Sequence, residues 1–113
     1  MSAVVRLKDF RRRAPYLHFT RAELNRLLGL YASRVSRGEW RDYAIHHGPE
    51  AASFMVFASS NEQPLFTVSK LAKAKSADRR FVVMSRGAVK LKQSGDLADA
   101  LAIFDRPIKL VSG

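Results

Sequence analysis

The sequence contains no cysteine, and this absence removes several classes of chemistry at once. A disulfide framework, a thiolate metal site and a thiol nucleophile all require cysteine, and a chain without it fits a reducing compartment. Long apolar runs are also missing, since no stretch approaches the roughly 18–20 apolar residues that span a bilayer. The N-terminus places a short apolar run before its charges, the reverse of a secretory signal. The sequence therefore predicts a cytoplasmic protein without a membrane span.

Familiar catalytic motifs are absent as well. The chain has no P-loop, no glycine-rich dinucleotide loop, no nucleophile elbow and no H-E-x-x-H. His46 and His47 are adjacent on a predicted strand, so they point to opposite faces, whereas a metal site needs three or four converging ligands. We therefore expect a non-catalytic protein with no cofactor and no metal.

What is present indicates one small domain. The 113 residues, 47% of them hydrophobic, are enough to bury a core without covalent links. Three consecutive arginines and then Ala14-Pro15 precede the first helical pattern, and proline disfavours helix at that point. We expect residues 1–18 to form a basic, partly mobile arm and residues 19–113 to form a single domain.

The first helix has the clearest start signal in the chain. Thr20 and Glu23 form a capping box, in which each side chain can bond the backbone N–H of the other residue. An apolar stripe with helical spacing follows, and Gly38 is a typical C-terminal signal. The spacing predicts a helix over 21–37. A second, shorter helix is predicted from Asp96, a plausible N-cap, to Asp105.

Short apolar segments separated by turn residues predict about five strands, over 40–45, 53–58, 65–71, 81–84 and 88–92. The connections are too short for parallel crossovers, so the sheet should be mostly antiparallel. The apolar runs 53–58 and 81–84 should be central, with 53–58 covered on both faces. In 88–92 the alternation predicts one buried face and one basic face. The predicted fold class is α+β: this sheet packs on the long N-terminal helix, and the short C-terminal helix closes an end or edge.

Charge is the most distinctive property of the chain. The net charge of +10 is unevenly spread, because residues 42–69 contain no lysine or arginine while both flanking segments are strongly basic. Such a surface suits a phosphate backbone, since each neutralised phosphate releases counterions. The candidate polyanion-binding residues are Arg11, Arg12, Arg13, Arg21, Arg26, Arg34, Arg37, Lys73, Lys75, Arg79, Arg80, Lys90 and Lys92. Tyr16, Trp40 and Tyr43 are candidates for base stacking, with core packing as the alternative for these aromatics.

These observations favour a basic accessory protein that binds nucleic acid, RNA or DNA, or a complex associated with it. No RNP, homeodomain or zinc-finger pattern narrows the partner further. One alternative is a protein-interaction module that docks on an acidic protein or forms a homodimer. A small enzyme or ligand binder is the third, and a pocket lined by Arg41, Asp42, Tyr43 and His46 would favour it.

Three runs of sequence resemble a known family. They are RAELNRLLGLYASRVSRGEWRDYAI, FMVFASSNEQPLFTVSKL and KLKQSGDLADALAIFDRPIKLV, which together extend over roughly residues 19–111. The chain is similar there to a small bacterial family known as domain of unknown function 2794. The resemblance implies a cytoplasmic bacterial protein, with an alphaproteobacterial source favoured. It carries no activity and no catalytic residues over to this chain.

Overall fold

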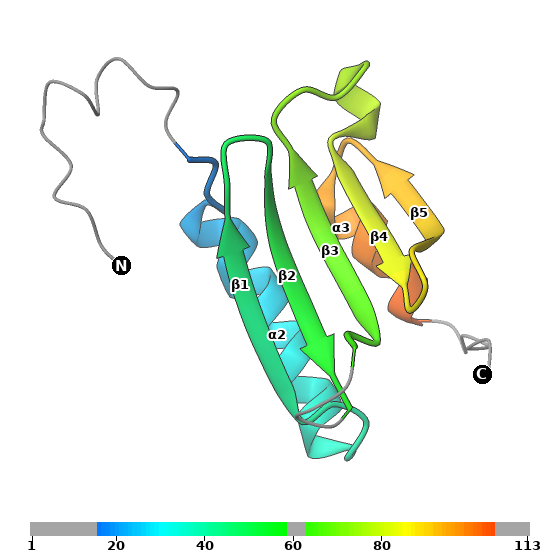
Figure 1. The fold of residues 1–113 in the computed structure, drawn as a ribbon. Coiled ribbons are helices and arrows are strands. Elements are labelled where there is room, and N and C mark those ends of the chain that lie inside the picture. Colours follow the sequence, from blue (N-terminus) through cyan, green and yellow to red (C-terminus); the bar gives the residue numbers. More distant parts are fainter. Residues whose placement is uncertain (1–15, 59–62, 106–113) are drawn as a thin grey trace, which may run out of the picture.

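The computed structural model describes residues 16–58 and 63–105. Five strands form one antiparallel sheet in which every strand lies beside its neighbour in sequence (Figure 1). The strands are β1 (Asp42–His47), β2 (Ala51–Phe57), β3 (Phe66–Leu71), β4 (Phe81–Ser85) and β5 (Val89–Ser94). The helical elements are α2 (Arg21–Ser36), α3 (Leu97–Leu101) and the short 3-10 helices η1 (Ala77–Arg79) and η2 (Ala102–Asp105). The α+β class and the antiparallel meander are confirmed.

Helix α2 begins and ends where the sequence predicts, to within a residue. The Thr20 hydroxyl accepts a hydrogen bond from the Glu23 amide at 3.1 Å, and the Glu23 carboxylate accepts one from the Thr20 amide at 2.8 Å. At the other end Gly38 has φ +75, a conformation that favours glycine and reverses the chain toward β1. Leu27 is fully buried against the sheet.

Both helices lie on the same face of the sheet, behind it in the view of Figure 1. Helix α3 packs there on β4 and on β5, which is an edge strand of the sheet. The physical reason is its apolar side, where Leu97, Ala100 and Leu101 must all be buried. The prediction that residues 53–58 form a strand covered on both faces is wrong. In the described part of the chain, only one face of β2 meets a helix.

Strand β5 does not alternate as predicted. The register with β4 shifts between Val83 and Met84, which places Lys90 opposite Met84 but Lys92 opposite Val83. A bulge of this kind changes the face on which the following side chains lie. Lys90 and Lys92 therefore belong to different faces, and Val89 is exposed rather than buried.

The last residues of the predicted arm belong to the packed domain. The Leu17 amide donates to the Gly48 carbonyl at 2.8 Å, and Leu17 packs against the core. The remainder of the predicted arm, residues 1–15, and the C-terminal segment 106–113 lie outside the described residues. Among the helices that are described, none has the length and apolar character needed to cross a membrane.

Candidate polyanion-binding site

Lys70 is an unusual residue of the sheet because its position is a core position. In β3 the alternate residues Phe66, Val68 and Lys70 face the helices, and Lys70 is only 7% exposed. Its ammonium donates to Glu23 Oε1 at 2.9 Å and to the His18 carbonyl at 3.0 Å. These two bonds fix the start of α2 over the end of β3, since burying an unpaired ammonium is costly.

Glu23 therefore has two roles, as part of the helix cap and as the partner of Lys70. Burial by itself raises the pKa of this carboxyl, but hydrogen bonds from Lys70 and Thr20 and the Lys70 charge outweigh that effect. The pKa of Glu23 consequently lies below its ordinary value of 4.5. The carboxylate stays ionised near neutral pH and neutralises Lys70 locally.

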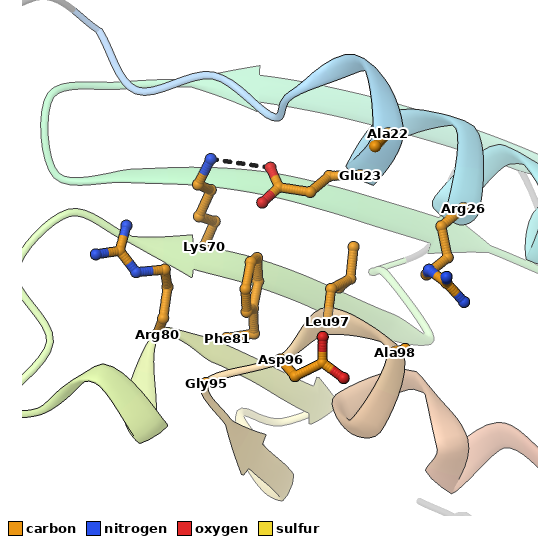
Figure 2. A pocket seen from close by; sticks show the side chains of 10 residues that line it. All are labelled: Ala22, Glu23, Arg26, Lys70, Arg80, Phe81, Gly95, Asp96, Leu97 and Ala98. Atoms are coloured by element: carbon orange, nitrogen blue, oxygen red, sulfur yellow. Dashed lines mark hydrogen bonds and ion pairs between the residues drawn. The ribbon is translucent and has the colours of Figure 1, made fainter.

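An open cavity of about 420 Å³ lies beside this pair, between the start of α2 and the start of α3. Figure 2 shows Lys70 and Glu23 pointing toward one another, with Arg26 and Arg80 on opposite sides of the cavity. Arg26 and Arg80 are exposed, and no carboxylate of the described residues pairs with either. The cavity thus lies between Arg26 of α2 and Arg80, which comes just before β4.

The basic loop between β3 and β4 is held by backbone contacts rather than by its charged side chains. The Gln93 side-chain amide donates to the Arg79 carbonyl at 3.0 Å. The loop also passes so close to Gly95 that a Cβ there would come within 2.8 Å of the Asp78 Cα. Because these contacts use main-chain atoms, the loop's cationic side chains remain free to project into solvent.

Six of the candidate residues gather at one end of the described domain, which we call the basic end. They lie on the first turns of α2 and in the β3–β4 connection, which includes η1. All six are exposed: Arg21, Arg26, Lys73, Lys75, Arg79 and Arg80. The β1–β2 turn borders the same end, because the Ala72 amide donates to the Glu50 carbonyl at 2.9 Å.

Four other candidates lie elsewhere and have different surroundings. The guanidinium of Arg34 is half-buried, pairs with Glu39 at 3.3 Å and bonds to the Phe104 carbonyl. Arg37 follows the last turn of α2, some 24 Å along the helix axis from its start. The ammonium of Lys92 lies 3.8 Å from the Asp99 carboxylate, and that of Lys90 donates to the Gln93 side chain. Arg11, Arg12 and Arg13 lie outside the described residues.

The three candidate stacking aromatics have different environments. Trp40 is 4% exposed and packs edge-on against Phe104, so its assignment to base stacking is wrong. Core packing accounts for it, because a large apolar ring gains most from burial. Tyr43 is partly exposed, but its ring stacks on Phe54 at 5.4 Å between centroids. Tyr16 is 60% exposed and stands next to Leu17, which bonds the β1–β2 turn near the basic end.

Two of the three histidines, His18 and His47, lie in contact. The His18 and His47 rings meet edge to face at 4.2 Å between centroids. Burial lowers the pKa of His47, and the neighbouring His18 and His46 lower it further. Within residues 16–58 and 63–105, no three histidine, aspartate or glutamate side chains gather as metal ligands would. The cavity between α2 and α3 contains none of the four residues 41, 42, 43 and 46 that would have favoured a small enzyme.

Sequence reasoning missed the two residues that position this site. Lys70 falls on the same parity as Phe66 and Val68, and that alternation was the available signal for a buried lysine. For Gly95 no local signal existed. A side chain at this position would collide with the backbone of η1, which lies sixteen or more residues earlier in the chain.

Comparison with family models gives one match, over residues 17–101, to a family described as a protein of unknown function, DUF2794. The match extends over well more than half of the chain, so the chain belongs to the DUF2794 family. Comparisons with curated proteins and with solved structures find no match. The family therefore supports the domain's identity and leaves its function to be argued from the geometry.

Proposed function

We propose that this member of the DUF2794 family is a non-catalytic accessory protein of the bacterial cytoplasm that binds nucleic acid through its basic end. The supporting observation is the gathering of six exposed cations at that end, from two segments that are far apart in the sequence. Phosphate contacts from lysine and arginine provide most of the free energy of nonspecific nucleic-acid binding. A surface of this kind fits RNA or DNA without requiring base-specific contacts.

Four carboxylates lie in or beside the basic end, and none of them forms an ion pair with its six cations among the described residues: Glu23, Glu50, Asp78 and Asp96. Glu23 is already occupied by Lys70 and the helix cap. Asp78 accepts a hydrogen bond from the Ser76 hydroxyl, which holds the pKa of Asp78 below its ordinary value. Arg26 and Arg80 lie on opposite sides of the open cavity, so a phosphate that enters the cavity can approach both guanidinium groups. Tyr16, which is 60% exposed, is available to stack on an unpaired base.

Fluorescence anisotropy with labelled single-stranded RNA and duplex DNA, measured over about 50 to 200 mM salt, tests this proposal. Binding should weaken steeply with salt. The double variant Arg79→Gln/Arg80→Gln should reduce the slope of log K against log salt by about 2 for duplex DNA, since each lost phosphate contact removes about 0.9. Neither side chain forms a hydrogen bond or an ion pair within the described part of the chain.

The matched control removes the same number of exposed arginines at the other end, in the variant Arg37→Gln/Arg41→Gln. Its slope should stay close to that of the wild type. Equal losses in the two variants would contradict a localised site, and absence of binding at low salt would overturn the function itself. Tighter binding to polyglutamate than to RNA would instead identify an acidic protein as the partner.

A further inference from the structure

The sheet face that points away from both helices, which we call the open face, is poor in charge. By register its described side chains are Asp42, Ala44, His46, Ala51, Ser53, Met55, Phe57, Thr67, Ser69, Leu71, Val82, Met84, Lys90 and Gln93. Only two of these fourteen are lysine, arginine, aspartate or glutamate, although such residues make up 27% of the chain. The solvated face of an antiparallel sheet is normally its polar face, whereas half of these fourteen side chains are apolar.

The apolar residues of the open face form a layer separate from the helix-side core. Met55, Phe57, Leu71, Val82 and Met84 are absent from the core cluster that packs against α2 and α3. They occupy β2, β3 and β4, the three inner strands, where Thr67 lies between Met55 and Met84 and the Ser53–Ser69 pair lies beside Val82. Apolar side chains gathered in one region of a protein surface commonly mark an interaction site.

The polar groups at the centre of the open face satisfy one another. Ser53 and Ser69 are cross-strand neighbours, and their hydroxyl oxygens are 3.0 Å apart. A pair bonded in this way can be covered by another apolar surface at little cost, because neither hydroxyl loses its partner. The middle of the face is therefore suited to burial.

We propose that the open face is the interface of a homodimer in which two copies stack sheet on sheet. The two charges of the face favour a second copy as the occupant. Asp42 lies on β1 at one edge of the sheet, and Lys90 lies on β5 at the opposite edge, about 19 Å away at the usual strand spacing. A two-fold axis parallel to the strands and passing over β3 places β1 of one copy above β5 of the other.

This symmetry brings unlike charges together. The register aligns Ala44, Met55, Thr67, Met84 and Lys90 in one row across the sheet, and Asp42 is two residues, about 7 Å, from that row. In the dimer each aspartate accordingly approaches the lysine of the partner copy, twice per interface. A self-complementary pattern of this kind is what an isologous contact requires.

Three of the five strands that form the open face bring no lysine or arginine to the contact. Two copies that each carry a net charge of +10 repel one another. The segment 42–69, which supplies β1, β2 and most of β3, contains no lysine or arginine, so repulsion is weakest when these strands form the contact. Since the axis is parallel to the strands, both basic ends then lie at the same end of the dimer, where their mutual repulsion opposes the association.

Pairing through the free edge of β1 is the competing arrangement. There, however, the Asp42 carboxylate already accepts a hydrogen bond from the Tyr43 backbone amide at 2.8 Å. A partner strand would have to displace this bond, and such side chains at an edge protect against strand addition. The open face has no comparable obstruction among the described residues.

Sedimentation velocity on the full chain, purified free of nucleic acid, tests the dimer. The wild type should sediment with twice the 12.7 kDa mass of one chain at micromolar concentration. Met84→Glu places a charge in the middle of the open face and should give monomers, with circular dichroism confirming the fold. The matched control Ala32→Glu adds the same charge on the exposed side of α2 and should remain dimeric.

A charge exchange tests the arrangement without relying on Met84. Asp42→Lys and Lys90→Asp should each weaken the dimer about tenfold, because two exposed pairs are lost per interface. The double variant should recover most of the wild-type affinity. A wild type that is monomeric at every concentration, a Met84→Glu variant that stays dimeric, or a double variant no better than its parents would each overturn the proposal.

Discussion

Replacing Lys70 with methionine removes the ammonium that joins the sheet to the start of α2 while keeping most of the aliphatic stem. Two bonds are lost, to Glu23 Oε1 at 2.9 Å and to the His18 carbonyl at 3.0 Å. Breaking a fully buried ion pair costs about 3–5 kcal/mol. The side chain of Glu23 is 19% exposed and keeps its bond to Thr20, so we expect a loss of about 2–3 kcal/mol in the free energy of unfolding.

Urea denaturation followed by the fluorescence of Trp40, the single tryptophan of the chain, measures this loss directly. In a domain of this size the corresponding drop in Tm is about 10–20 °C. Lys73→Met is the matched control, because Lys73 is exposed in the next loop and should change stability by less than about 0.5 kcal/mol. If Lys70→Met is no less stable than Lys73→Met, the pair contributes nothing and the reasoning fails.

The same pair makes a signed prediction for acid. The pKa of Glu23 is lower in the folded protein than its ordinary value of 4.5, so the ionised carboxylate stabilises the fold. That contribution is complete above the unfolded pKa and is lost as the pH falls through the lower folded pKa. Lys70→Met removes the charge that lowers the pKa, so its stability should decline less below pH 4.5 than that of the wild type.

Two further predictions concern backbone packing and histidine titration. Gly95→Ala should destabilise the domain by about 1–3 kcal/mol in urea denaturation, since its Cβ would overlap the backbone of η1, whereas Gly29→Ala, with nothing within 4 Å, should stabilise α2 by up to about 1 kcal/mol. Equal effects of the two alanines would contradict the close approach. In the folded protein the pKa of His47 lies below 6.5, so the free energy of unfolding should fall as the pH drops below 6.5. The variant His47→Gln should flatten this pH dependence. If the profile of the variant is unchanged, the pH dependence comes from other groups.

Local patterns were sufficient for the elements themselves. The capping box at Thr20 and Glu23 and the stop at Gly38 define α2 because capping involves only residues within one turn. Likewise, short turns between apolar segments impose an antiparallel meander, since no crossover helix is available. The segment 42–69, which contains no lysine or arginine, was visible in the sequence, and it forms β1, β2 and most of β3.

Only the tertiary structure decided which candidate side chains are buried or hydrogen-bonded within the domain and which face solvent. Trp40 was a stacking candidate by residue type, but long-range packing against Phe104 buries it. Arg34 was a surface arginine by pattern, yet it bonds a carbonyl seventy residues away. Such pairings depend on the position of a second element, which helical or strand periodicity does not encode.

The sequence by itself thus determined the α+β class, the helix limits and the uneven charge of this chain, because each follows from neighbours along the backbone. Only the tertiary structure decided that α3 lies on the same face of the sheet as α2. The local sequence shows that α3 has an apolar side to bury, but it does not show which face of the sheet will cover that side. That placement leaves the other face of the sheet without a helix in the described part of the chain. The tertiary structure also brings six cations of α2 and of the β3–β4 connection to one end.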